Sequence, residues 1–256
     1  MRRNSQRIKF ENDRGISLAG ILELPEQEPV AYALFSHCFT CTKDLKAIVR
    51  ISRSLAAKGI AVLRFDFTGL GDSGGDFSHT TFHDNQSDVF AAIRYLTEND
   101  SAPQILIGHS LGGAAMIAIA SQVDSARCVV NIASPSHTQH LARFLVNESR
   151  QIEEEGVGDV VIGGRTHRIR RPMVEALRNW DHEQVLRELK LPLLVLFSPE
   201  DETLPFDHGI KMFELAGGPT SFINLDGADH LLVNQPEDVE FVADMIASWS
   251  KRYLSD

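Results

Sequence analysis

One stretch, residues 104–114, constrains the fold of this chain more than any other. Ile105 to Ile107 form a short apolar run that predicts a buried strand, and Gly108-His109-Ser110-Leu111-Gly112 follows it directly. Ala- and Met-rich sequence with helical character comes next. The stretch therefore predicts a strand, a tight turn with a serine at its apex, and a helix, with glycines that let strand and helix pack closely.

Ser110, at the apex of this turn, is a candidate nucleophile. A helix that begins beneath it aims free backbone N–H groups and the positive end of its dipole at a developing oxyanion. The alternative is a Gly-rich strand-to-helix turn with an incidental serine, because the pentapeptide also occurs by chance. Partners elsewhere in the chain decide between the two interpretations.

Size and charge exclude several classes of protein. The 256 residues can bury a sizeable core as one α/β domain, and a net charge of -10 argues against binding to nucleic acid or to an anionic membrane. We find no apolar run of membrane-spanning length and no secretory signal. Three cysteines give no disulfide framework, so we predict a cytoplasmic protein without metal or cofactor.

Strands and helices alternate along most of the chain. Residues 7–11 and 16–24 predict an antiparallel hairpin at the edge of a mostly parallel, doubly wound sheet. The charge-rich residues 134–188 interrupt the alternation, and we interpret them as a helical cap inserted into a core formed by residues 1–133 and 189–256. The other predicted elements are helices at 44–58, 82–98, 139–154, 172–188, 207–216 and 236–253, strands at 30–35, 60–65, 128–133, 193–197 and 220–225, and a turn or short strand at 160–162.

Two late loops carry the partners that a serine nucleophile needs, a base to take its proton and an acid to orient the base. His230 lies between the last strand and the last helix, and Asp201 follows the strand at 193–197. We choose Asp201 because the residues after it close the turn, and Glu200 is the alternative acid. Asp229 is more simply interpreted as a cap of its own loop.

The predicted oxyanion hole consists of two backbone N–H groups. Leu111 follows the nucleophile directly, and Phe39 lies in the loop after the strand at 30–35. Along the chain the order is Ser110, Asp201, His230, which is the order of nucleophile, acid and base in one large class of hydrolases.

Four motifs together make the chain resemble the α/β hydrolase superfamily over essentially its whole length. The resemblance implies the α/β-hydrolase fold, with an N-terminal antiparallel hairpin and a helical cap, and a serine hydrolase that cleaves carboxylic esters through an acyl-enzyme. At position 38 the superfamily usually has glycine, whereas this chain has Cys38. The motifs are Ser36-His37-Cys38-Phe39, Arg64-x-Asp66-x-x-Gly69-x-Gly71-x-Ser73, Gly108-His109-Ser110-Leu111-Gly112-Gly113 and Gly227-Ala228-Asp229-His230.

Residues 37–41, 62–71 and 226–232 are also similar to a bacterial subgroup of this superfamily. In that subgroup the hydrolase is often the N-terminal half of a bifunctional protein with an OsmC-type peroxidase domain. The chain ends about where the second half would begin, so we interpret it as a stand-alone version or as a trimmed form.

Two other functions are compatible with the same residues. A cofactor-free perhydrolase would use the triad with peroxide as acyl acceptor, and a non-catalytic binding protein would keep the scaffold without the chemistry. Thioesters could replace esters as substrates. The expected partner is a small-molecule ester, not nucleic acid or membrane, and the sequence is compatible with a homodimer.

The substrate pocket is predicted to include His37 and Cys38 together with apolar residues of the cap. These cap residues could equally form the cap's own core. Arg165, Arg168, Arg170 and Arg171 could attract a carboxylate substrate, but a solvated basic face is the favoured interpretation. The predicted apolar lining is Phe144, Leu145, Val174, Leu177 and Trp180.

Cys38 and Cys41 form a Cys-x-x-Cys in the predicted oxyanion loop. Zinc binding needs more ligands than this loop offers, so we predict a reduced, packed pair. A sharper hypothesis is a redox switch, in which oxidation moves the Phe39 N–H out of position. Equal rates of ester cleavage by the oxidised and reduced protein would contradict it.

Overall fold

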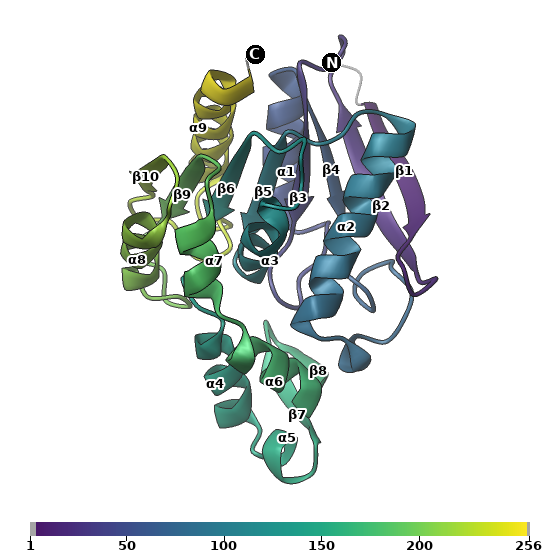
Figure 1. Ribbon diagram of the computed structural model, residues 1–256, viewed down its shortest axis with the longest axis vertical. Coiled ribbons are helices and arrows are strands. Elements are labelled where there is room, and N and C mark those ends of the chain that lie inside the picture. Colours follow the sequence, from purple (N-terminus) through teal and green to yellow (C-terminus); the bar gives the residue numbers. More distant parts are fainter. Residues whose placement is uncertain (1–3, 255–256) are drawn as a thin grey trace.

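The computed structural model describes residues 4–254, which form an eight-stranded sheet with helices on both faces (Figure 1). The strand order is β1-β2-β4-β3-β5-β6-β9-β10. β1 and β2 form an antiparallel hairpin, and the strands from β4 onwards in that order pair in parallel. The strands are β1 (Asn4–Glu11), β2 (Ser17–Leu24), β3 (Ala31–Ser36), β4 (Ile60–Phe65), β5 (Ile105–His109), β6 (Cys128–Ile132), β9 (Leu193–Phe197) and β10 (Thr220–Asn224).

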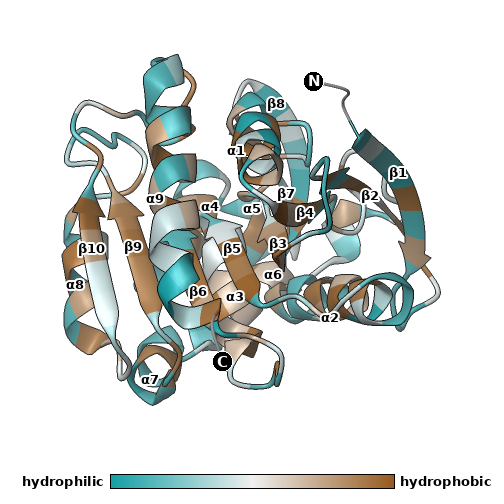
Figure 2. Cartoon of the chain, turned by 90° about the horizontal axis from the view of Figure 1, so that it is seen from above, coloured by the Kyte–Doolittle hydropathy of each residue, from teal (hydrophilic) through white to brown (hydrophobic). Residues whose placement is uncertain are grey.

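Helices α1 and α9 cover one face of the sheet, and α2, α3 and α8 cover the other (Figure 2). α3 is buried on every side, which explains why its sequence is apolar all round. The helices are α1 (Lys46–Ala57), α2 (Phe82–Asn99), α3 (Leu111–Ala120), α7 (His182–Glu188), α8 (Asp207–Leu215) and α9 (Pro236–Leu254), with a short 3-10 turn, η1 (Phe77–His79).

Successive side chains of the central strands face opposite sides of the sheet, and both sides are buried. On β5, Leu106 packs with the α2 and α3 side, whereas Ile105 and Ile107 pack with the α1 and α9 side. A strand buried on both faces is apolar at most positions, so it reads as a near-continuous apolar run, here interrupted by Arg64 on β4 and Asn131 on β6. This is why the central strands could be predicted from the sequence.

The cap elements lie together below the sheet in Figure 1. They differ from the prediction in two places. Gly163 and Gly164, both with positive φ, form a tight turn between two paired strands, so the second strand was missed. The helix predicted at 139–154 is interrupted at Ser149. The cap elements are α4 (Gln139–Glu148), α5 (Gln151–Glu154), β7 (Val157–Ile162), β8 (Arg165–Arg170) and α6 (Arg171–Asn179).

The helix predicted at 172–188 is also two helices, α6 and α7. Asp181 accepts a hydrogen bond from the Gln184 N–H at 3.0 Å and starts α7 as a new helix. α7 packs against α3 and α8, so this end of the predicted insertion lies on the core. The remaining predicted elements are found within a few residues, and the predicted fold class is confirmed. None of the helices within residues 4–254 is long and apolar enough to cross a membrane.

Candidate active site

Ser110 sits in a strained turn between β5 and α3. Its φ of 53° and ψ of -125° are unusual for a residue with a side chain. A Cβ on Gly108 would overlap the backbone of Gly113, and a Cβ on Gly112 would overlap the backbone carbonyl of His37. The glycines of the motif are therefore required by close backbone packing around the serine.

His230 and Asp201 meet at the same end of the sheet. The Nδ1 atom of His230 lies 2.7 Å from Oδ2 of Asp201, whose carboxylate is fully buried. The other oxygen of Asp201 accepts hydrogen bonds from the Thr203 and Leu204 N–H groups, each at 2.8 Å. Burial alone would raise the pKa of Asp201, but the His230 contact and these N–H groups outweigh it and lower the pKa. Asp201 therefore stays ionised.

The two competing carboxylates have other partners. Glu200 is bonded to the Ser198 hydroxyl at 3.2 Å and to the Gly227 N–H at 2.9 Å. Asp229 accepts from the N–H groups of Leu231, Val233 and Asn234, as predicted for a residue that caps its own loop. Of the three carboxylates, Asp201 alone contacts the His230 ring within the described residues.

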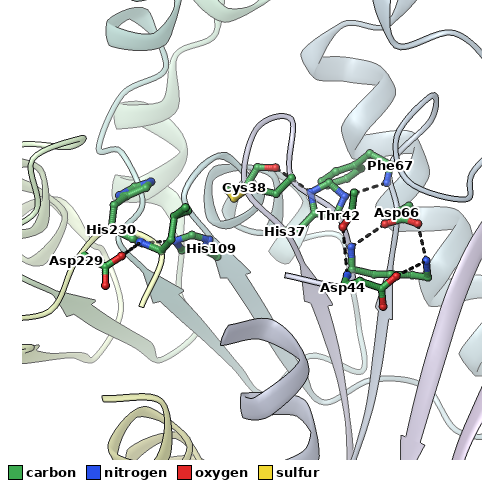
Figure 3. The surroundings of a disulfide bond; sticks show 12 residues. His37, Cys38, Thr42, Asp44, Asp66, Phe67, His109, Asp229 and His230 are labelled. Carbon is green, nitrogen blue, oxygen red and sulfur yellow. Dashed lines mark hydrogen bonds and ion pairs between the residues drawn. A yellow bond between two sulfur atoms is a disulfide. The ribbon is translucent and has the colours of Figure 1, made fainter. Parts of the chain in front are cut away.

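His109 ties the His230 loop to the serine turn, and sequence reasoning missed this role. Its Nε2 lies 2.7 Å from the backbone carbonyl of His230, and the two rings lie 5.1 Å apart (Figure 3). Because a carbonyl only accepts, Nε2 of His109 carries the proton. Burial and the charge of His230 lower the pKa of His109 to about 3, so its ring is neutral at physiological pH.

The predicted nucleophile and the predicted base are not in hydrogen-bond contact. Within residues 4–254, no hydrogen bond joins Ser110 Oγ to the His230 ring. Such contacts are often long without substrate and tighten in the reacting complex. The Ser110–His230 contact therefore stays a prediction, whereas the Asp201–His230 contact is present.

Both predicted oxyanion donors are available. Among the described residues, neither the Leu111 N–H nor the Phe39 N–H donates to a protein acceptor. Leu111 is the first residue of α3, where N–H groups have no partner within the helix. Ser36 Oγ donates to the Gly112 carbonyl at 2.8 Å and holds the start of the Phe39 loop against the turn.

Cys38 and Cys41 are joined by a disulfide, so the prediction of a reduced pair is wrong. The Cys41 N–H donates to the Cys38 carbonyl at 3.1 Å, and Thr40 adopts a positive φ of 61°. This turn brings the two Cα atoms to 5.2 Å, within the range that a disulfide spans. Among the described residues, the Phe39 N–H has no protein partner when the pair is bonded, and the redox hypothesis stays a prediction.

A buried ionic network anchors the other end of this loop (Figure 3). The Lys43 ammonium contacts the carboxylates of Asp66 at 2.8 Å, Asp72 at 2.7 Å and Asp44 at 3.0 Å. Burial alone would lower the pKa of Lys43, but the carboxylates, Asp66 first among them, outweigh it and raise the pKa. Arg64 Nε donates to the Lys43 carbonyl at 2.9 Å. The network fixes the loop that carries Phe39 against the loop after β4.

His37 and Cys38 are buried and do not line a pocket, contrary to the prediction. His37 Nδ1 donates to the Cys38 carbonyl at 2.8 Å, and its Nε2 accepts from the Phe67 N–H at 3.2 Å. Cys38 is held in the disulfide. Both residues shape the loop, and neither offers a surface to substrate.

The predicted apolar lining is also wrong in its main part. Leu145, Val174 and Leu177 are at most 1% exposed because they form the cap's own core. Phe144 is exposed, and Trp180 packs edge-on against Phe82. The amphipathic pattern of the cap helices predicts burial, but it does not distinguish a core from a pocket wall.

Two of the four arginines considered for a carboxylate substrate, Arg168 and Arg171, have partners within the cap. Arg168 is paired with Asp159 at 3.0 Å, and Arg171 Nε donates to the Ile152 carbonyl at 3.4 Å. These contacts favour the interpretation as a solvated basic face.

Among the described residues, no group of three or more histidine, cysteine or acidic side chains is arranged to hold a metal ion.

We expect His109→Ala to lower kcat by about 10- to 100-fold, because the His230 loop loses its tether and small misplacements of a base are costly. His109→Gln should recover much of this activity, since its amide can donate to the same carbonyl. Steady-state kinetics across pH measure both effects. If the two variants lose activity equally, the residue fills space and does not position His230.

Comparisons with known proteins agree with this geometry. The sequence pattern of the alpha/beta hydrolase family matches residues 33–244. The esterase domain of a Rhodothermus marinus protein is 39% identical, with a TM-score of 0.80 over 98% of this chain and 100% of that chain. Est1E from Butyrivibrio proteoclasticus, solved with ferulic acid, has a TM-score of 0.84 over 97% of this chain and 100% of that chain, at 20% identity.

Another relative is named as a thioesterase. The mitochondrial palmitoyl-protein thioesterase ABHD10 of Bos taurus is 27% identical over 177 residues, which are 67% of this chain and 56% of that protein. The chain thus matches little more than half the length of this relative. The family match covers most of the chain and agrees with the sheet order and the serine turn. The chain belongs to the alpha/beta hydrolase family.

Proposed function

We propose that the protein is a serine hydrolase that cleaves carboxylic esters, including thioesters, through an acyl-enzyme. His230 takes the proton of Ser110, and Asp201 holds the imidazole in the tautomer that can do so. The N–H groups of Leu111 and Phe39 stabilise the oxyanion, each contributing about 3 kcal/mol to the transition state. His230 then activates water for deacylation.

The contact between Asp201 and His230 is the observation that carries this proposal. At 2.7 Å it links two loops from different parts of the chain, and the His109 tether holds the base loop against the serine turn. A structural role alone would not require a buried carboxylate aimed at an imidazole beside a strained serine. Perturbed and paired titratable groups of this kind cluster at functional sites.

The relatives support ester chemistry at a coarse level. The similarity to the Rhodothermus marinus esterase domain supports carboxylic esters as the proposed substrates. The similarity to the thioesterase ABHD10 supports keeping thioesters in the proposal. Both bonds pass through a tetrahedral oxyanion, so one set of residues serves both. Location in the cytoplasm and assembly as a homodimer remain proposals without support of their own.

A fluorophosphonate probe tests the proposal, because it reacts with an activated serine. We expect the wild-type protein to be labelled and Ser110→Ala to lose the label, while Ser121→Ala, which changes an exposed serine near the end of α3, keeps it. An unlabelled wild type would favour a binding protein. Label that persists in Ser110→Ala would place the nucleophile elsewhere, and peracid formation with added peroxide would identify a perhydrolase.

A further inference from the structure

Three histidines meet where the cap joins the core. His137 lies just before α4, His140 lies in its first turn, and His208 lies in α8. The His208 ring is 4.7 Å from the His137 ring and 5.2 Å from the His140 ring, measured between centroids. We call these residues the imidazole cluster. His137 and His140 belong to the predicted cap insertion and His208 to the core after it, and no motif in the sequence links them.

The imidazole cluster follows β6, the strand that lies next to the one that leads into Ser110. β5 lies between β3, which leads into the oxyanion loop, and β6, which leads into the cluster. The Ser110 N–H donates to the carbonyl of Ile132 at the end of β6, at 2.9 Å. The charge of His230 is one of the smaller causes that lower the pKa of His140.

Each ring of the cluster has a nitrogen available to a ligand. His208 Nδ1 accepts from the Ser136 N–H at 3.2 Å, so its proton is on Nε2. The Nδ1 atoms of His137 and His140 are buried without a partner. Within residues 4–254, the three Nε2 atoms have no protein partner either, but they are not buried. Since a buried N–H without an acceptor is costly, the neutral ring of His140 carries its proton on Nε2.

His140 and His208 are uncharged at neutral pH. Burial, followed by repulsion from His137, lowers the pKa of His140 and of His208 to about 4. Arg143 and Lys211 add further repulsion, and Lys211 is itself paired with Glu183. An uncharged donor set suits an uncharged oxygen group better than a carboxylate. The donor arrangement does not suit a metal ion among the described residues.

We infer that His137, His140 and His208 form a polar subsite that binds a hydroxyl group on the substrate. The inference rests on the proposed function and names the class of ester, one with a hydroxyl in the part that lies beneath the cap. At most two of the Nε2–H groups donate to the lone pairs of the hydroxyl oxygen, while the scissile carbonyl faces Ser110. A substrate without the hydroxyl leaves these donors without a partner.

Matched pairs of esters test the inference. Ethyl 3-(4-hydroxyphenyl)propanoate is compared with ethyl 3-phenylpropanoate, and ethyl 6-hydroxyhexanoate with ethyl hexanoate. A third pair, 2-(4-hydroxyphenyl)ethyl acetate and 2-phenylethyl acetate, carries the hydroxyl on the alcohol side. Methylene groups separate each hydroxyl from the carbonyl, so intrinsic reactivity is similar within a pair. We expect kcat/KM to be about tenfold higher for the hydroxylated member of at least one pair, as one hydrogen bond provides.

Substitutions in the imidazole cluster then test whether the preference for the hydroxylated ester comes from these histidines. His140→Phe and His208→Phe should each reduce the ratio within that pair to near one, whereas His140→Gln, which keeps a donor, should retain most of it. The ratio is the readout, so a general loss of activity cancels. His79→Phe, which changes an exposed histidine outside the cluster, should leave the ratio unchanged.

Two outcomes overturn the inference while leaving the proposed function intact. One is Ser110-dependent cleavage with no preference for a hydroxyl in any pair. The other is a preference that survives both phenylalanine variants, which would make the cluster a structural contact between cap and core. An absence of Ser110-dependent cleavage of every ester would overturn the proposed function itself.

Discussion

Replacing His230 with alanine is expected to lower kcat for ester cleavage on the order of a millionfold, with Ser110 still present. The physical reason is that a serine hydroxyl is a weak nucleophile until a base takes its proton. Asp201→Asn should cost about ten-thousandfold, because the amide at 2.7 Å from Nδ1 would favour the wrong imidazole tautomer. Steady-state kinetics with an activated ester, or single-turnover kinetics for the slow variants, measure both losses.

The adjacent carboxylate provides the matched control. Glu200→Gln should stay within about threefold of wild-type kcat, because Glu200 contacts Ser198 and Gly227 and not the base. A loss comparable to that of Asp201→Asn would instead make Glu200 the acid. The double variant Ser110→Ala/His230→Ala should be no slower than either single variant, since the residues act as one unit.

Lys43→Met is expected to lower the free energy of unfolding by about 3 to 5 kcal/mol, because it leaves the buried Asp66 carboxylate without its counter-ion. The Lys43 side chain is 4% exposed and that of Asp66 is fully buried, so water cannot replace the ammonium. For a chain of this size, such a loss corresponds to roughly 6 to 20 °C in Tm. Urea unfolding followed by circular dichroism measures it.

Two comparisons decide whether the buried charge is the cause. Lys43→Met/Asp66→Asn should recover part of the lost stability, because the unpaired charge is gone. Lys58→Met breaks an exposed pair with Asp244 at 2.7 Å and should cost at most about 1 kcal/mol. If the double variant is less stable than Lys43→Met, the loss comes from the hydrogen bonds of Asp66 with backbone N–H groups and not from its charge.

The Lys43 contribution also has a defined dependence on pH. Because folding raises the pKa of Lys43, its stabilising effect is complete below the unfolded value of about 10.4. The effect is lost as the pH rises above that value and the ammonium loses its proton. The stability difference between wild type and Lys43→Met should therefore be constant near neutral pH and shrink in strongly alkaline buffer.

Local sequence patterns were sufficient to predict the central strands, the serine turn and the candidate acid. A strand buried on both faces is apolar at most positions, so the central strands could be predicted directly, and the glycines around Ser110 are required by backbone packing within a few residues. The turn that follows Asp201 favoured this residue over Glu200, and the same turn supplies its Thr203 and Leu204 N–H bonds. Each of these inferences depends on neighbours close in the chain.

Contacts between distant segments could not be predicted in this way. The same apolar spacing describes a cap core and a pocket wall, so Leu145, Val174 and Leu177 were assigned to the wrong one. Likewise, spacing alone did not show whether Cys38 and Cys41 would bond, because the backbone of Thr40 decides their separation.

The sequence by itself determined the alternation of strands and helices, the serine turn, and the loops that carry the acid and the base. Only the tertiary structure decided that His109 holds the His230 carbonyl, that Lys43 neutralises Asp66, and that histidines from two segments lie side by side. The physical reason is that periodicity and turn chemistry act over a few residues, whereas these contacts depend on strand order and on how the cap packs onto the sheet.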